Sequence, residues 1–282
     1  MENKILVTGA TGNIGCHIVR LLKNRGADFV IGTNTTSTDG VDSVSIDFAD
    51  VASLEEATQD VSTVFILLPV HPDTVQWGRN IISAAKTSGV KHIVRSSSDV
   101  AYKAPSYDFM KLIRETDLDV INSGLNYTIT APQFFMQNFS TVLADDYKNG
   151  ALYLLAGEGK VGWVDLRDIA AVTVEVLLNP ESFNHQTLTI TGSESFSYDE
   201  AVNQMNEVLG KKTQYVAVPD ETAIKAMEEN KFPPFIVDVM MNLNNAVAEG
   251  RVDEVTDTVK TVTGKKPISF KQFVADNKDI WL

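Results

Sequence analysis

The stretch Lys4–Gly15 reads KILVTGATGNIG, and it decides the fold. Residues 4–8 form a short apolar run that ends at a glycine, which is typical of a strand buried on both faces of a parallel sheet. Beyond the glycines, apolar residues recur at helical spacing: Ile14, Ile18, Leu21 and Leu22. The stretch therefore predicts a strand, a glycine-rich turn and a helix, in that order.

Three glycines in this turn, Gly9, Gly12 and Gly15, form a GxxGxxG pattern. Gly9 allows a tight turn, Gly12 lets the backbone approach a phosphate closely, and Gly15 lets the helix pack against the strand. The N-terminus of the helix offers free N–H groups and a dipole that favours negative charge. Because the pattern lies between a strand and a helix, it predicts a dinucleotide pyrophosphate at this turn, with a ligand-free glycine turn as the alternative.

The alternation of strands and helices continues along the first half of the chain. Further strands are expected at residues 29–33, 43–46, 63–68, 91–96 and 127–131. Helices are expected at residues 74–88, at residues 134–143, and after Ser53, which is a candidate N-cap. This rhythm is typical of βαβ units with right-handed crossovers. We therefore predict an α/β fold with a doubly wound parallel sheet, the Rossmann arrangement.

The pattern changes beyond about residue 150. A strand at residues 186–191 is followed by amphipathic helices at residues 198–209 and 234–249. We expect residues 1–150 to form a dinucleotide-binding domain. Residues 151–282 are expected to complete the sheet and to form a smaller, mostly helical substrate domain.

Composition narrows the classes of partner. The 282 residues carry a net charge of −13, so direct binding to nucleic acid is not expected. The single cysteine, Cys16, excludes an internal disulfide, and we expect it to be buried in the core. The four histidines show no metal-ligand spacing, so no metal site is predicted. No apolar run approaches the ~20 residues of a membrane span and the first residues do not resemble a secretory leader, which favours a cytoplasmic protein without a membrane partner.

Five segments taken together resemble the NmrA-like family of atypical short-chain dehydrogenase/reductases. They are VTGATGNIG at 7–15, LLP at 67–69, HIVRSSS at 92–98, SGLNYTITAPQFFMQNF at 123–139 and VDLRDIA at 164–170. Relatives in this family include NADPH-dependent reductases of quinones and of triphenylmethane dyes. The resemblance implies an NAD(P) cofactor and a small-molecule acceptor.

The resemblance also implies which residues hold the cofactor. Those around the pyrophosphate and its riboses are Gly9, Thr11, Gly12, Asn13, Ile14 and Gly15. Those beside the adenosine are Asp47, Phe48, Leu67, Leu68 and Pro69. Those around the nicotinamide are Ser96, Ser97, Pro132, Gln133, Phe134 and Phe135, the last four closing over the ring.

Residues 31–40, IGTNTTSTDG, bear on the choice between NAD and NADP. At this place an acid selects the ribose of NAD, and an Arg accommodates the 2′-phosphate of NADP. Relatives commonly carry that Arg where this chain has Asn34, and Asp39 comes too late to replace an early acid. The neutral donors that remain are Asn34, Thr35, Thr36 and Ser37. Because neutral donors can bind a phosphate that an acid would repel, we predict NADP, with NADPH modestly preferred and NAD possible.

Tyr107 and Lys111 have the Tyr-x-x-x-Lys spacing of the larger superfamily. On a helix this spacing puts phenol and ammonium on one face, where the charge would lower the phenol pKa. Counting back from SGLNYT, however, places the catalytic Lys or His of the NmrA-like family on Ile113. Lys111 lies two residues away, on roughly the other side of a helix. Tyr107 and Lys111 are therefore candidate catalytic residues, with a solvated helix start as the alternative.

Three functions fit these patterns. The first is an NAD(P)H-dependent reductase of a flat, electron-poor acceptor such as a quinone or dye, in which hydride transfer needs no strongly marked catalytic acid. The second is a non-catalytic NAD(P)-binding redox sensor that signals to a regulatory protein partner. The third is an epimerase or dehydratase of nucleotide sugars, to which the Tyr107 and Lys111 pair would point. A homodimer is compatible with each.

Overall fold

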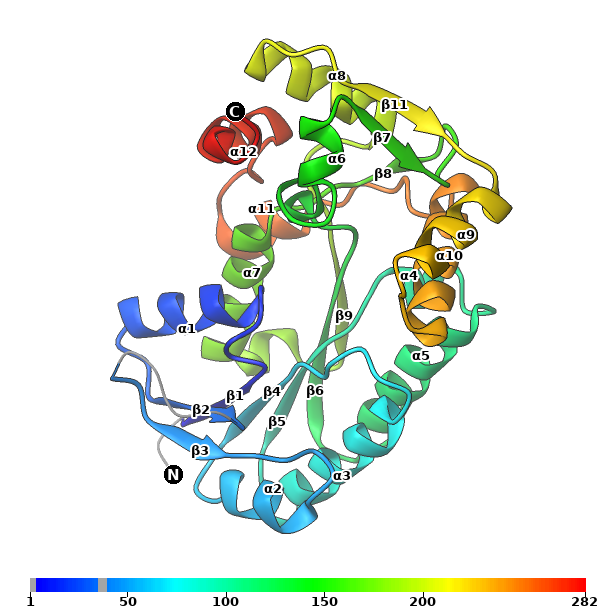
Figure 1. The fold of residues 1–282 in the computed structure, drawn as a ribbon. Coiled ribbons are helices and arrows are strands. Elements are labelled where there is room, and N and C mark those ends of the chain that lie inside the picture. Colours follow the sequence, from blue (N-terminus) through cyan, green and yellow to red (C-terminus); the bar gives the residue numbers. More distant parts are fainter. Residues whose placement is uncertain (1–3, 35–39) are drawn as a thin grey trace. The chain divides into compact units, whose positions relative to one another are not determined.

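The computed structural model describes residues 4–34 and 40–282, and the chain divides into two compact units. The first unit comprises residues 1–98, 112–132 and 169–189, and it is built on a seven-stranded sheet (Figure 1). The strand order is β3-β2-β1-β4-β5-β6-β9. The strands are β1 (Ile5–Thr8), β2 (Phe29–Thr33), β3 (Ser43–Ser45), β4 (Thr63–Ile66), β5 (His92–Ser96), β6 (Asn126–Pro132) and β9 (Gln186–Ile190). The neighbouring pairs from β3 to β6 are parallel, so the predicted α/β fold with a doubly wound parallel sheet is confirmed.

Burial explains why the central strands read as continuous apolar runs. Every residue of β1, β4 and β5 is buried, because helices cover both faces of the sheet. The helices of this unit are α1 (Gly15–Asn24), α2 (Val51–Ala57), α3 (Thr74–Thr87), most of α5 (Asp108–Ile121) and most of α7 (Leu166–Leu178), followed by the 3₁₀ turn η2 (Pro180–Phe183). On one face, Leu6, Val64 and Ile93 pack against Leu54 of α2 and Ile81 of α3. The predicted first strand and the helices α2 and α3 are therefore two layers of one core.

Two local predictions in this unit are wrong. Ser53 is not the N-cap of α2, because Asp50 stands at that position and its Oδ1 accepts the amide of Ala52 at 3.0 Å. The Ser53 hydroxyl instead donates to the Asp50 carbonyl at 2.9 Å, one turn into the helix. Cys16 is exposed and not a core residue, because the first turn of α1 directs it away from the sheet, with its Sγ 3.4 Å from the Asn13 carbonyl oxygen.

The second unit comprises residues 99–111, 133–168 and 190–282. It contains two small sheets, a parallel pair of β7 (Ala151–Leu154) with β11 (Gln214–Ala217) and an antiparallel pair of β8 (Lys160–Val161) with β10 (Phe196–Ser197). Its helices are α4 (Val100–Lys103), η1 (Met136–Ser140), α6 (Ala144–Lys148), α8 (Tyr198–Leu209), α9 (Asp220–Glu229), α10 (Pro234–Ala248), α11 (Thr258–Thr263), α12 (Phe270–Asp276) and η3 (Lys278–Ile280). The chain passes between the two units several times, because it leaves the first unit after β5, after β6 and after β9, and returns to it through α5 and through α7. The division at residue 150 into a dinucleotide-binding domain and a smaller substrate domain remains a prediction.

The two long helices of the second unit follow their sequence signals closely. Helix α8 begins with a capping box in which Ser197 and Glu200 satisfy each other's backbone amides, and it ends at Gly210 with a positive φ of 67°. Pro234 starts α10. The helix expected at residues 134–143 shrinks to the 3₁₀ turn η1, because Phe134 and Met136 form backbone hydrogen bonds with Val164 and keep Phe135 extended.

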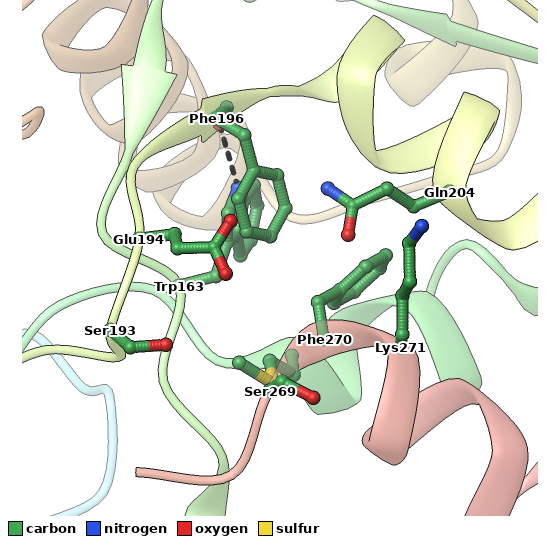
Figure 2. Close-up of a pocket in the computed structure, with 9 residues that line it drawn as sticks. Trp163, Ser193, Glu194, Phe196, Gln204, Ser269, Phe270 and Lys271 are labelled. Atoms are coloured by element: carbon green, nitrogen blue, oxygen red, sulfur yellow. Dashed lines mark hydrogen bonds between the residues drawn. The ribbon is translucent and has the colours of Figure 1, made fainter. Parts of the chain in front are cut away.

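Aromatic side chains form the core of the second unit. The Trp163 ring lies 5.0 Å from both Phe139 and Tyr198, and its Nε1 donates to the Phe196 carbonyl at 3.0 Å (Figure 2). Gly192 is required here, since a Cβ on it would lie 2.0 Å from the Trp163 carbonyl oxygen. Among residues 4–34 and 40–282, no helix combines the length and apolar character that crossing a membrane requires.

Candidate dinucleotide site

The glycine turn between β1 and α1 is shaped by contacts with the Gly9 carbonyl. Gly9 has a φ of +65°, and its oxygen accepts the Gly12 amide at 3.0 Å. A Cβ on Gly15 would lie 2.0 Å from this oxygen, so only glycine fits there. A Cβ on Gly12 would lie 3.3 Å from the same oxygen, a tight but adjustable distance, and Gly12 is exposed. Gly15 therefore has a structural role, and Gly12 keeps the surface of the turn open.

Backbone amides in this turn are available to a ligand. Within the described part of the chain, the amides of Thr11, Asn13 and Ile14 have no hydrogen-bond partner. They precede a ten-residue helix whose dipole favours negative charge at this end. Unpaired amides, a helix N-terminus and a surface that a Cβ at Gly12 would fill are the features of a phosphate cradle. The residues present fit the pyrophosphate of a dinucleotide.

Thr8, the last residue of β1, fixes the turn, although the sequence analysis did not single it out. Its buried hydroxyl donates to the Phe65 carbonyl and accepts the Leu67 amide, both at 2.9 Å. These bonds tie the ends of β1 and β4 together and bring Leu67 under Gly9, where a Cβ on Gly9 would lie 3.0 Å from the Leu67 side chain. A polar residue at the end of an apolar strand, directly before a glycine, is the sequence signal that could have revealed it.

Most other predicted residues of the first unit follow the carboxyl ends of successive parallel strands. Asn34 follows β2, Asp47 and Phe48 follow β3, Leu67, Leu68 and Pro69 follow β4, Ser96 and Ser97 stand at the end of β5, and Pro132 ends β6. In a parallel sheet these ends share one edge, which is where nucleotides bind in such folds. Asn34 is exposed, whereas Leu68 and Ser96 are buried. The remaining neutral donors and the late acid lie outside the described residues: Thr35, Thr36, Ser37 and Asp39.

The predicted adenosine side carries an aromatic stack that the sequence did not reveal. Phe48 stacks on Trp77 of α3 with ring centroids 6.2 Å apart, and Trp77 stacks on His71 at 4.3 Å. Asn80 donates its amide to the Phe48 carbonyl at 2.8 Å, which holds this loop to α3. Asp47 accepts the Ala49 amide at 2.8 Å and is exposed. The loop after β3 is therefore held in one conformation by α3.

Ser97 is held by a buried ion pair. Its hydroxyl donates to Asp117 Oδ2 of α5 at 2.5 Å, and Arg95 Nε lies 3.5 Å from Asp117 Oδ1. Asp117 is completely buried and Arg95 is 4% exposed. An Arg inside an apolar strand requires a buried partner, and this requirement is the signal that could have predicted Asp117. The Ser97 oxygen can still accept a hydrogen bond, while its proton is committed to Asp117.

Tyr107 and Lys111 do not form the contacts that would make a catalytic pair. Lys111 Nζ pairs with Asp108 at 2.7 Å, and the Lys111 side chain is 57% exposed. Burial raises the pKa of Tyr107, and the neighbouring Glu249 carboxylate raises that pKa further. A catalytic phenol needs the opposite shift. The catalytic role of Tyr107 and Lys111 thus remains a prediction, without support from these contacts.

Gln133 has a structural role within the second unit. It is 3% exposed, and its Nε2 donates to Asp99 Oδ2 at 3.0 Å and to the Glu254 carbonyl at 3.3 Å. Its Oε1 accepts the Gly162 amide at 2.9 Å. The next two residues, Phe134 and Phe135, are partly buried, and Phe134 lies edge-on to Trp163 at 5.8 Å. That Pro132, Phe134 and Phe135 cover a nicotinamide ring remains a prediction.

The sequence profile of the NmrA-like family matches residues 1–273, nearly the whole chain. The chain belongs to the NmrA-like family. The resemblance drawn from the five sequence segments is therefore confirmed.

Several proteins that resemble the chain are reductases by name. The chain is 34% identical to the NAD(P)H azoreductase of Xenophilus azovorans over 95% of its own length and 96% of the relative's. Two solved structures share the fold at lower identity. The NADPH-dependent quinone oxidoreductase of Escherichia coli, complexed with NADPH, has a TM-score of 0.89 at 20% identity, covering 96% of this chain and 99% of the other. The triphenylmethane reductase of Citrobacter sp. has a TM-score of 0.88 at 22% identity, covering 98% of this chain and 99% of the other.

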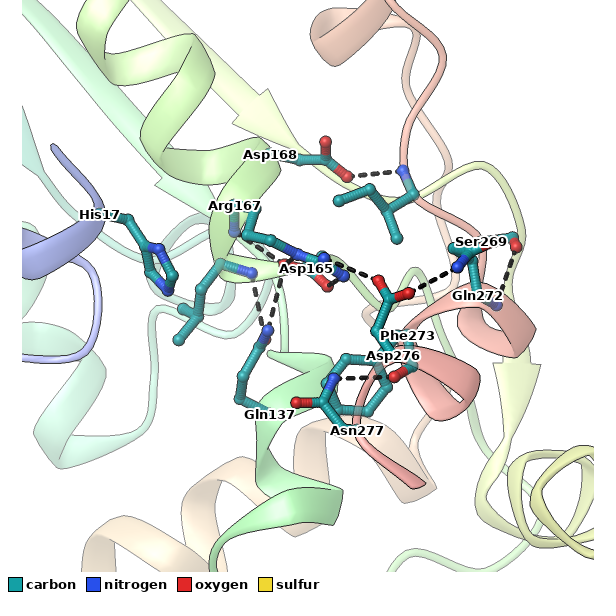
Figure 3. A network of polar contacts seen from close by, with 12 residues as sticks. His17, Gln137, Asp165, Arg167, Asp168, Ser269, Gln272, Phe273, Asp276 and Asn277 are labelled. Atoms are coloured by element: carbon teal, nitrogen blue, oxygen red, sulfur yellow. Dashed lines mark hydrogen bonds and ion pairs between the residues drawn. The ribbon is translucent and has the colours of Figure 1, made fainter. Parts of the chain in front are cut away.

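The NmrA-like segment 164–170 forms a polar network in the second unit (Figure 3). The buried Asp165 carboxylate accepts the Arg167 amide at 2.8 Å and pairs with the Arg167 guanidinium at 2.8 Å. Gln137 donates to Asp165 at 3.1 Å and accepts the amide of residue 166 at 3.0 Å. Arg167 also pairs with Asp276 of α12 at 2.7 Å. This segment therefore joins η1, the start of α7 and α12, and its role is structural.

Metal binding has no support in the described residues. Across 4–34 and 40–282, no group of three or more His, Cys, Asp or Glu side chains could hold a metal ion.

The buried ion pair predicts a large difference between two aspartates on α5. Asp117→Asn should lower the free energy of unfolding by about 3–5 kcal/mol, because it leaves the Arg95 charge buried without its carboxylate. Asp119 lies two residues further along α5 and pairs with Arg79 at the surface. Asp119→Asn should lower the free energy of unfolding by only about 0–1 kcal/mol. Urea unfolding of both variants measures the difference. Equal effects would contradict the assignment of a buried pair.

Asp168 predicts a pH-dependent stability. Burial, with a smaller contribution from the nearby Asp165, raises the pKa of Asp168 to about 6, against the hydrogen bond from the Ile268 amide at 2.7 Å. A carboxyl group with a raised folded-state pKa stabilises the fold fully below the unfolded value of 3.8, and this contribution is lost as the pH rises through about 6. Asp168→Asn should therefore exceed the parent in stability at pH 8 by up to ~3 kcal/mol, with the difference vanishing near pH 4.

Thermal unfolding at several pH values measures this difference. Asp238→Asn is the matched control, because it removes the same charge from an exposed position of α10. A difference between Asp168→Asn and the parent that does not change between pH 4 and pH 8 would contradict the prediction.

Proposed function

We propose that this chain is an NAD(P)H-dependent reductase of a flat, electron-poor acceptor that is quinone-like or dye-like. The observation that carries the proposal is the cradle at the N-terminus of α1, with three unpaired amides beside a surface that any side chain at Gly12 would fill. Neutral amides suit a pyrophosphate in a chain of net charge −13, since they attract the anion without a cation.

The remaining residues of the site would orient the dinucleotide. The Phe48 and Trp77 rings and the Leu67–Pro69 segment would border the adenine and its ribose. Ser97 would accept a hydrogen bond near the nicotinamide, held in place by Asp117. The bound nicotinamide would supply the hydride, while the protein fixes the distance and orientation of the acceptor.

Three observations support the class of acceptor. The relatives named azoreductase, quinone oxidoreductase and triphenylmethane reductase act, by their names, on azo compounds, quinones and triphenylmethane dyes, which are conjugated electron acceptors. Helix α10 carries a partly exposed apolar face, Ile236, Met240 and Leu243, of the kind that contacts a flat apolar body. The raised pKa of Tyr107 suits acceptors that need no protein acid.

A second candidate is a redox sensor that binds NAD(P) without turning over a substrate and signals to a protein partner. Ile113 stands where the family's catalytic Lys or His is expected, and Lys111 is committed to Asp108 at the surface. The lack of a basic residue at position 113 and the surface ion pair of Lys111 both favour the sensor function. A single-turnover assay of NADPH oxidation with a panel of small quinones separates the two functions, because a sensor oxidises none of them.

Substitutions at Gly12 and Gly15 should affect different properties, the first cofactor binding and the second the stability of the fold. Gly12→Val should abolish stabilisation by NADPH while leaving the fold intact, because Gly12 is exposed and its Cβ meets only one atom at 3.3 Å. Gly15→Ala should lower the free energy of unfolding by at least ~1–3 kcal/mol, because its Cβ overlaps backbone. Thermal unfolding with and without NADPH measures both. Unchanged NADPH affinity in a folded Gly12→Val variant would remove the basis of the proposed site.

Asn34 predicts a modest cofactor preference. NADPH should bind about ten- to a hundredfold more tightly than NADH, because neutral donors hold the 2′-phosphate less strongly than an Arg does. Asn34→Arg should widen the gap and Asn34→Asp should reverse it. Titration of both reduced cofactors measures the ratio. A clear NADH preference in the parent would mean that this loop selects the bare ribose.

Replacement of Tyr107 tests whether its hydroxyl acts as a general acid. Tyr107→Phe should keep quinone reduction within about tenfold of the parent, whereas loss of a true general acid costs ~10²–10⁴-fold. Tyr153→Phe, which removes a hydroxyl from an exposed strand position, is the matched control. A thousandfold loss confined to Tyr107→Phe would restore the mechanism of the larger superfamily.

A further inference from the structure

The second unit contains a pocket that the proposed reductase site does not use. Its volume is about 370 Å³, and it lies among η1, the segment before β10, α8 and the start of α12. All of its lining residues belong to the second unit, so its form does not depend on the dinucleotide cradle. A volume in this range suits a small organic ligand.

The floor of the pocket is aromatic and fixed. Trp163, Phe196 and Phe270 line it together with Met136, and these four side chains are buried. The Phe196 ring lies 6.3 Å from Trp163 and 5.1 Å from Phe270, and the Trp163 Nε1 bond to the Phe196 carbonyl holds the rings in register. Fixed aromatic side chains give the pocket an apolar lining that loses little conformational entropy when a ligand binds.

The rim of the pocket offers polar groups without partners. Glu194 approaches from one side, and Gln204 approaches from the other, with the rings of Phe196 and Phe270 between them (Figure 2). In the described ranges, neither the Glu194 carboxylate nor the Gln204 amide nor the Ser193 hydroxyl has a hydrogen-bond or ion-pair partner. A carboxylate above aromatic rings can bind a cation through both charge and cation–π contact.

The charges at the rim of the pocket favour a cationic ligand over an anionic one. Lys271 lines the same pocket, but its Nζ pairs with Glu207 at 2.6 Å. Because that ion pair is neutral, the unpaired Glu194 leaves the rim negative. An anionic ligand would have to break the Lys271 pair, whereas a cation meets Glu194 directly.

We propose that this pocket is a second binding site, and that its ligand is a small organic cation, an ammonium group on a flat aromatic body. The ammonium binds the Glu194 carboxylate, and the aromatic body enters the pocket and contacts the exposed parts of the Phe196 and Phe270 side chains that line it. Gln204 and Ser193 donate or accept hydrogen bonds at its edges. The site is separate from the proposed dinucleotide cradle, and it stands whether or not the chain is a reductase.

Tryptamine is a suitable probe, because it carries an ammonium on an indole, and tryptophol is its neutral counterpart. Isothermal titration of the full chain should show saturable one-site binding of tryptamine that is tighter than that of tryptophol. Glu194→Gln should weaken tryptamine binding about three- to tenfold and leave tryptophol within about twofold. Glu228→Gln, which removes the same charge from an exposed position of α9, should change neither.

A second variant tests the charge balance independently. Glu207→Gln frees the Lys271 ammonium, so it should weaken tryptamine and strengthen the anionic analogue indole-3-acetate. Thermal unfolding of each variant establishes that it is folded. The proposal is overturned if the parent binds tryptamine no more tightly than tryptophol, or if Glu194→Gln and Glu228→Gln behave alike.

Discussion

The absence of a Cβ at Gly15 is the constraint on which the dinucleotide cradle depends. Because a side chain there would lie 2.0 Å from the Gly9 carbonyl oxygen, helix α1 can start against the turn only with glycine at this position. This turn also requires the positive φ of Gly9. The Thr8 hydroxyl connects the turn to the end of β4 through two hydrogen bonds. One missing methyl group thus allows the turn that carries three free amides, and the Thr8 hydroxyl separately joins this turn to the end of the neighbouring strand.

Sequence patterns predicted the features that local chemistry determines. The apolar run of β1, the Ser197 cap of α8 and the Gly210 that ends it are all read from neighbouring residues. Errors arose where two signals compete within a few residues, as with Asp50 and Ser53 at the start of α2, or where a segment distant in sequence competes with a helix, as with Val164 beside Phe134. The first kind of error comes from two equally good local signals, and the second from a contact that the local sequence does not contain.

The candidate site was predictable to the same extent. The glycine turn could be proposed as the site because its conformation depends on adjacent residues, whereas the partner of Ser97 lies 20 residues away on α5. Gln133 looked like a ligand-binding residue because it stands beside Phe134 and Phe135, yet its amide joins Asp99, Gly162 and the Glu254 carbonyl. A polar residue in a family motif is as often there to join loops as to bind a ligand, and only contacts distant in sequence distinguish the two.

The interleaved units have a consequence for how this protein can be dissected. Strand β6 ends at Pro132, but its outer neighbour β9 begins at Gln186, after the chain has built part of the second unit. A fragment cut at residue 150 would therefore carry six strands with β6 as a bare edge, and bare edges pair with other chains. Exchange of the second unit between relatives would need joins at several points of the gene, one at each crossing of the chain from one unit to the other.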